Sequence, residues 1–257
     1  MSVDSHDPGG KVRLAFAAQE QEVQLHVYRG AFDVSNPRIP AGEQRVITLD
    51  PPERFGLTQA SALQSGAFSP EVWRVVIGGG VLGFLGLDDF GTPVRPPAAA
   101  ETPAVRWLAY GSSITQSWAK GYPHQAARRL GIDVLNKGMS GNCHIEPEMA
   151  DYLAELDWEI ATLELGVNMR VRYTSEAFAS RARDLIDRLR AAKPRAPLVL
   201  ITTFRNLDHF PAATPPPAAE SQTAFDRILR QLHQERNDPH LHLLEGLDLL
   251  QDFSALS

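Results

Sequence analysis

The chain has 257 residues, 43% of them hydrophobic and 22% charged, and a formal net charge of −6. This length allows one large globular domain or two smaller ones, and the negative charge argues against nucleic acid or an anionic membrane as a partner. The single cysteine, Cys143, excludes an internal disulfide and a cysteine-based zinc site.

The first residues, 1–11, are polar and contain Gly and Pro, with no apolar run of the kind found in a signal peptide. No later stretch approaches the roughly 20 apolar residues that span a bilayer. We therefore expect a cytoplasmic protein that is not inserted in a membrane.

Residues 1–95 show mainly strand patterns. Val23, Leu25 and Val27 alternate on one face of a strand over 22–28, and further strands are expected over 45–49, 72–77 and 81–87. No strong helix pattern occurs there. We predict a small antiparallel β-sandwich domain over 1–95 and a Pro- and Ala-rich linker over 96–104.

Strand and helix patterns alternate from residue 105 to the end of the chain. Strands are predicted over 105–110, 132–135, 160–165, 197–203 and 241–244, with helices over 123–130, 147–156 and 218–236 between them. A further helix, capped by Thr174 or Ser175, should have one apolar face made of Phe178, Ala182, Leu185, Ile186 and Leu189. The pattern predicts an α/β domain over 105–257 with a parallel sheet of about five strands covered by helices on both faces.

Three of these strands end in residues that can carry chemistry. Ser112 and Ser113 follow the first strand, Gly141 follows the second, and Asn168 follows the third. A serine at such a turn can be a nucleophile, and backbone or amide N–H groups can bind an oxyanion; capping and turn roles are the structural alternatives. Because ligands in open α/β sheets bind beyond the carboxyl ends of the strands, we expect these groups to form one site.

The run Gly-Ser-Ser-Ile-Thr at 111–115, Asn-x-Gly-x-Ser-Gly at 136–141 and Gly-Val-Asn at 166–168 resemble the first three blocks of the SGNH (GDSL) hydrolases. The resemblance implies a flavodoxin-like three-layer α/β/α fold. It implies Ser113 as nucleophile, with an oxyanion hole made by the N–H groups of Ser113 and Gly141 and by the Asn168 amide. The preceding β domain suggests a narrower branch of this family, in which a jelly-roll-like domain precedes the hydrolase domain and some members resemble acyltransferases or carbohydrate esterases.

Two features depart from this family. Ser112 stands where the family usually has Asp, and no Asp-x-x-His segment follows Leu250, so we expect a C-terminally incomplete or degenerate hydrolase domain. His144 is then the best substitute base, although a substrate contact or simple packing is the alternative role. Without a base, serine is a poor nucleophile.

The resemblance implies a serine esterase or acyltransferase that acts on small acyl esters, including esters of carbohydrates. The alternative is a catalytically impaired or truncated relative that binds an acyl or carbohydrate ligand. No cofactor and no metal are expected: the Gly-x-Gly-x-x-Gly match at 78–83 is not followed by the helix that a dinucleotide site needs.

Overall fold

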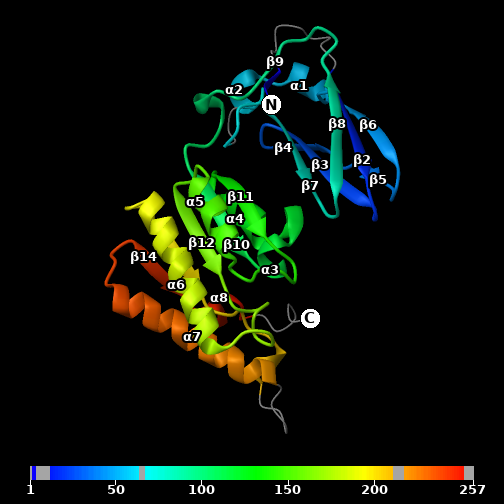
Figure 1. The fold of residues 1–257 in the computed structure, drawn as a ribbon. Coiled ribbons are helices and arrows are strands. Elements are labelled where there is room, and N and C mark those ends of the chain that lie inside the picture. The colour runs from blue at the N-terminus through cyan, green and yellow to red at the C-terminus, as the bar shows by residue number, and fades with distance from the viewer. Residues whose placement is uncertain (1, 4–11, 64–66, 211–216, 252–257) are drawn as a thin grey trace. The chain divides into compact units, whose positions relative to one another are not determined.

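The computed structural model describes residues 2–3, 12–63, 67–210 and 217–251 (Figure 1). Most of the polar N-terminal segment, residues 1–11, lies outside the described residues. The chain divides into two compact units. One contains residues 1–104, 118–120 and 124–133, and the other contains residues 105–117, 121–123 and 134–257.

The first unit contains two antiparallel sheets. One has the strand order β6-β2-β8, and in the other β3 pairs with β4, β5 and β7. A separate short pair joins β1 to β9. The strands are β1 (Ser2–Val3), β2 (Arg13–Ala18), β3 (Val23–Arg29), β4 (Phe32–Ser35), β5 (Arg38–Ile39), β6 (Gln44–Thr48), β7 (Trp73–Ile77), β8 (Leu82–Asp88) and β9 (Val94–Arg95).

A core lies between these two sheets. Leu14 and Phe16 of β2 contribute to it from one sheet, and Val23, Leu25 and Val27 of β3 contribute from the other. The predicted antiparallel β-sandwich is thereby confirmed. The sequence pattern missed β2, whose outward positions carry alanine, and the short helices α1 (Glu53–Leu57) and α2 (Ala60–Leu63).

The outer face of β3 and β7 is also covered within this unit. His26 and Tyr28 lie on this face and are 9% and 5% exposed. The covering residues come from η2 (Trp118–Lys120) and from the helical segment after His124: Trp118 lies over Gly79, and His124 and Arg128 lie near Arg74. The predicted linker contains η1 (Ala99–Glu101), and it belongs to this unit.

The second unit is built on a five-stranded parallel sheet. Its strand order is β11-β10-β12-β13-β14, which confirms the predicted flavodoxin-like fold. The parallel pairings along β10, β12, β13 and β14 place the carboxyl ends of neighbouring strands at one edge. The strands are β10 (Arg106–Gly111), β11 (Asp133–Gly138), β12 (Ile160–Glu164), β13 (Leu198–Ile201) and β14 (Leu241–Leu244).

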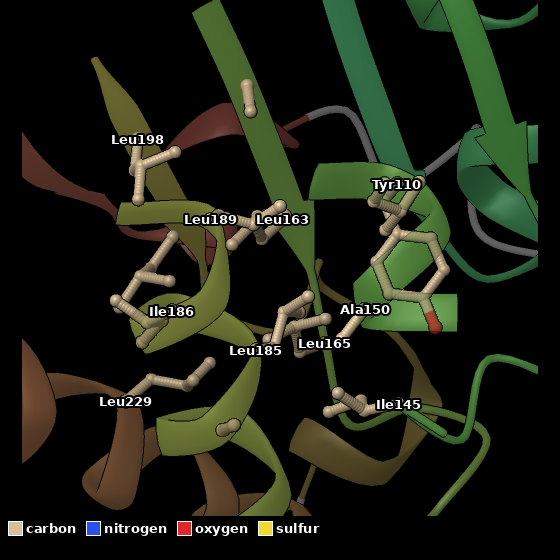
Figure 2. Close-up of a cluster of buried hydrophobic side chains, with 14 of the residues drawn as sticks. Tyr110, Ile145, Ala150, Leu163, Leu165, Leu185, Ile186, Leu189, Leu198 and Leu229 are labelled. Atoms are coloured by element: carbon tan, nitrogen blue, oxygen red, sulfur yellow. The ribbon is translucent and has the colours of Figure 1, made fainter. Parts of the chain in front are cut away.

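Helices α5, α6 and α7 contribute to the large core on one face of this sheet (Figure 2). The second unit's helical elements are α3 (Ser113–Gln116), the start of α4 (Tyr122–Leu130), α5 (Pro147–Glu155), α6 (Ser175–Ala192), η3 (Leu207–His209), α7 (Pro217–Arg236) and α8 (Gly246–Leu249). Helix α6 begins where the sequence predicts, because Thr174 Oγ1 accepts a hydrogen bond from Ala177 N. Its buried face consists of the predicted residues Phe178, Ala182, Leu185, Ile186 and Leu189.

Phe178 tests how far the sheet depends on this core. The side chain is fully buried and stacks on Phe225 of α7, with 4.2 Å between ring centroids. We expect Phe178→Ala to lower the free energy of unfolding by about 3–5 kcal/mol, because it removes buried apolar area and leaves a cavity. Chemical denaturation measures the change. Arg183→Ala, on the exposed face of α6, should change it by less than about 0.5 kcal/mol. Equal losses in the two variants would contradict the assignment of Phe178 to the core.

Candidate active site

The turn between β10 and α3 places its two serines in different environments. Ser112 caps α3: its Oγ accepts a hydrogen bond from Ile114 N at 3.2 Å, and the residue is 1% exposed. Ser113 is the first residue of the helix and is exposed. Ser112 is therefore committed to the turn, whereas the Ser113 hydroxyl is open to a ligand.

Close packing fixes this turn against the neighbouring strands. An added Cβ at Gly111 would collide with Thr115 Oγ1 and lie 2.6 Å from Glu164 Oε2. One at Gly138, the last residue of β11, would collide with the backbone nitrogen of Gln116. These two glycines let the strands approach the turn closely, and no larger residue fits without moving it.

The loop after β11 carries Gly141, and hydrogen bonds tie this loop to the serine turn. Met139 N donates to Gly111 O at 2.8 Å, and Ser140 N donates to Gln116 Oε1 at 2.8 Å. Gly141 has a φ of +70°, a conformation that favours glycine. Its N–H donates to no residue in the described part of the chain.

Asn168 joins the loop after β12 to the same assembly. Its Oδ1 accepts a hydrogen bond from Cys143 N at 3.2 Å. That bond uses the acceptor end of the amide and leaves Nδ2 without a partner among the described residues. Hydrogen bonds from backbone N–H groups thus bring the segments of Ser113, Gly141 and Asn168 together at the carboxyl edge of the sheet, as the topology predicts.

Glu164, the last residue of β12, was not identified as a site residue from the sequence. It is 2% exposed, and its Oε2 accepts hydrogen bonds from Ser112 N at 2.7 Å, Ser112 Oγ at 2.7 Å and Thr115 Oγ1 at 3.1 Å. Burial raises the pKa of this carboxyl above its ordinary value, and the hydrogen bonds from Ser112 and Thr115 act in the opposite direction. An acidic residue inside an apolar strand is the signal that would have found it, since buried carboxylates need partners.

A second polar side chain supports the turn from the start of α4. The Tyr122 hydroxyl lies 3.0 Å from Thr115 Oγ1, within hydrogen-bonding distance. The Tyr122 ring packs against Trp107 and Phe204. Burial raises the pKa of the Tyr122 hydroxyl to about 12, so it is protonated at neutral pH.

His144 lies in a separate cluster on the loop after β11. Its Nδ1 is 3.4 Å from Glu146 Oε1, its ring packs on Tyr173 with 5.4 Å between centroids, and its carbonyl accepts a hydrogen bond from Arg181. Its Nε2 is buried without a hydrogen-bond partner in the described part of the chain. His144 therefore makes no hydrogen bond to Ser113 in this structure, although its loop borders the serine turn.

The loops after β12 and β13 are joined by a further polar network. Arg170 Nη1 donates to Asp208 Oδ2 at 2.9 Å and to Gln222 Oε1 at 2.5 Å, and Asn206 Nδ2 also donates to Gln222 Oε1. These contacts hold η3 and α7 at the same sheet edge as Asn168.

No cluster of three metal-ligating side chains occurs among the described residues. Within the same residues, no helix has the length and apolar character to cross a bilayer.

The GDSL-like lipase/acylhydrolase family matches residues 109–255, more than half of the chain. The chain belongs to this family. The match contains the serine turn, the Gly141 loop and the Asn168 loop, so the predicted resemblance is confirmed. No curated protein matches the chain in sequence.

Three solved structures share the fold. The salicylyl-acyltransferase SsfX3 from a tetracycline biosynthetic pathway superposes with a TM-score of 0.66 at 15% identity, over 92% of this chain and 67% of that one. A Bacteroides ovatus protein assigned as a GDSL-like lipase gives 0.64 at 18% identity, over 95% and 73%. A family two carbohydrate esterase from Clostridium thermocellum, in complex with cellohexaose, gives 0.56 at 14% identity, over 95% and 87%.

Proposed function

We propose that this chain is a serine esterase or acyltransferase that acts on small acyl esters, esters of carbohydrates among them, through an acyl-enzyme on Ser113. One observation carries the proposal. An exposed serine starts α3, and the loops tied to its turn carry two donors, Gly141 N–H and Asn168 Nδ2, that no described residue uses. This is the donor arrangement that acyl transfer requires around a nucleophile.

In the proposed reaction, Ser113 Oγ attacks the ester carbonyl carbon and its proton passes to a base. The carbonyl oxygen becomes an oxyanion that accepts hydrogen bonds from the N–H groups of Ser113 and Gly141 and from Asn168 Nδ2. The C–O bond to the alcohol then breaks, and the leaving oxygen takes up a proton. Water or an acceptor hydroxyl attacks the acyl-enzyme in the second half, which releases an acid or a new ester and regenerates Ser113.

The titles of the structural neighbours suggest the substrate class. One neighbour is a salicylyl-acyltransferase, and others are carbohydrate esterases, including an acetyl xylan esterase from Butyrivibrio proteoclasticus. Identities of 10–15% to these proteins support the fold and leave the acyl group to experiment. We propose an ester with a small acyl group because the names of these neighbours include both a salicylyl group and an acetyl group on a carbohydrate.

The first test is intact-mass analysis after treatment with a fluorophosphonate, followed by peptide mapping. Stoichiometric labelling at Ser113 is expected.

The second candidate function is ligand binding without turnover, which is favoured by the absence of a hydrogen bond from any histidine to Ser113 among the described residues. A folded sample that binds acylated oligosaccharides but resists labelling would establish that second function and overturn the first.

A role for His144 is tested by substitution. We propose that it acts as base or contacts the substrate, with the Glu146 carboxylate 3.4 Å from its Nδ1 to orient the ring. His144→Ala is expected to lower kcat by at least about 10²-fold if the ring is the base, and to raise KM with little change in kcat if it contacts substrate. Hydrolysis of p-nitrophenyl acetate provides both constants. His242→Ala, at an exposed position on β14, is the control; kinetics of His144→Ala equal to those of the control would remove both roles.

A further inference from the structure

The carboxyl group of Glu164 holds the peptide segment that carries Ser113 at both of its ends. Its Oε2 receives the N–H and the hydroxyl of Ser112, just before Ser113, and the hydroxyl of Thr115, two residues after it. Three donors therefore converge on one oxygen atom. Ser113, between these anchors, is exposed while the anchors themselves are buried.

The direction of the Glu164 side chain follows from its place in the sheet. Leu163 and Leu165 point into the large core beneath α5, α6 and α7, so the intervening Glu164 points to the opposite face, where α3 begins. The contacts with Ser112 span 52 residues of sequence. They join the strand that leads to Asn168 with the turn that leads to Ser113.

Little space exists for this carboxyl group to move. The missing side chain of Gly111 leaves the room that Oε2 and Thr115 Oγ1 occupy. Thr115 Oγ1 is in turn 3.0 Å from the hydroxyl of Tyr122, whose ring packs against Trp107 and Phe204. A buried carboxyl group with several hydrogen bonds in a tight cavity has one arrangement available, because each lost bond leaves a buried polar group unpaired.

We propose that Glu164 is a positioning residue: it fixes the serine turn so that the N–H and hydroxyl of Ser113 face the same point as the Gly141 and Asn168 donors. The proposal rests on the function proposed above for Ser113. Glu164 touches neither substrate nor reacting atoms in this role. It acts through the N–H and hydroxyl of Ser112 and the hydroxyl of Thr115.

Two substitutions of Glu164 distinguish the effect of its hydrogen bonds on the serine turn from the effect of its charge. Glu164→Gln keeps an oxygen that can accept the three hydrogen bonds, whereas Glu164→Leu keeps approximate size and removes the acceptor. We expect Glu164→Gln to stay within about threefold of wild type in fluorophosphonate labelling, since its acceptor oxygen is retained. We expect Glu164→Leu to lose about 10²-fold in kcat with unchanged KM, because a misplaced nucleophile impairs only the chemical step. Glu155→Leu, at an exposed position on α5, is the matched control.

Amide hydrogen exchange of the peptide containing residues 111–117 supplies a readout independent of activity. Faster exchange in Glu164→Leu, with wild-type protection in Glu164→Gln, is expected. Wild-type exchange and labelling in Glu164→Leu would overturn the proposal, as would equal loss of activity in both variants with protected exchange. If Glu164→Leu does not fold, Thr115→Val removes one of the three bonds and should give a smaller change in the same direction. If wild type resists labelling, the proposed function fails while the exchange comparison still decides the role of Glu164.

Discussion

Ser113→Ala is expected to abolish fluorophosphonate labelling and to lower kcat for ester hydrolysis by at least about 10³-fold. The hydroxyl is the only atom of this residue that can form the proposed acyl-enzyme, whereas its N–H remains to bind the oxyanion. Substrate affinity should therefore change little. Mass spectrometry of labelled peptides and steady-state kinetics with p-nitrophenyl acetate measure the two effects.

Replacement of a second exposed serine is the control, because it shows whether the loss of labelling is specific to Ser113. Ser180→Ala replaces an exposed serine on α6 and should leave labelling and kcat unchanged. Because Ser112 is buried and bonded to Glu164, it should carry no label in wild type. Label mapped to Ser112, or full activity in Ser113→Ala, would show that the nucleophile has been misassigned.

Asn168 gives the second large effect. Asn168→Asp keeps the Oδ1 that accepts from Cys143 N and removes the Nδ2 donor, whereas Asn168→Ala removes both. We expect both variants to lose about 10²–10³-fold in kcat, equivalent to about 2.7–4 kcal/mol of transition-state stabilisation. The aspartate should be at least as impaired, because its charge repels a developing oxyanion. Steady-state kinetics, with a thermal melt to confirm folding, measure this.

Comparison of these two variants also shows which outcome would contradict an oxyanion-donor role for Asn168. If Asn168→Asp kept wild-type kcat while Asn168→Ala lost it, the residue would act as an anchor for the Cys143 loop and not as an oxyanion donor. Asn142→Ala, in an exposed part of the same loop, is the control for loop disturbance and should retain activity.

The serine turn departs from the usual sequence of the family. Its first block has Ser112 where the family usually has Asp, so the turn contains no carboxylate of its own. A carboxyl group from the neighbouring strand lies there instead, since Glu164 Oε2 accepts hydrogen bonds from both the N–H and the hydroxyl of Ser112. Glu164 and Ser112 are both buried beneath this turn, whereas Ser113 is exposed.

Local patterns determined much of this protein. The alternation of strands and helices after residue 105 specified a parallel sheet, and the spacing of Phe178, Ala182, Leu185, Ile186 and Leu189 specified the buried face of α6. The order of strands and the turn residues after them placed Ser113, Gly141 and Asn168 at one edge. Such features depend on neighbours within a few residues or on a sheet topology that the chain order restricts, so the sequence is sufficient for them.

The tertiary structure alone decided the remaining features. The strand β2 is recognised by its partners β6 and β8, because its alternate alanines give a weak pattern. The grouping of residues 118–120 and 124–133 with the first unit follows from contacts to β3 and β7, far away in sequence. Glu164 likewise finds its hydrogen-bond donors in Ser112 and Thr115, 52 and 49 residues earlier. A buried carboxyl group is defined by the donors that surround it, and those donors meet only when the sheet has formed.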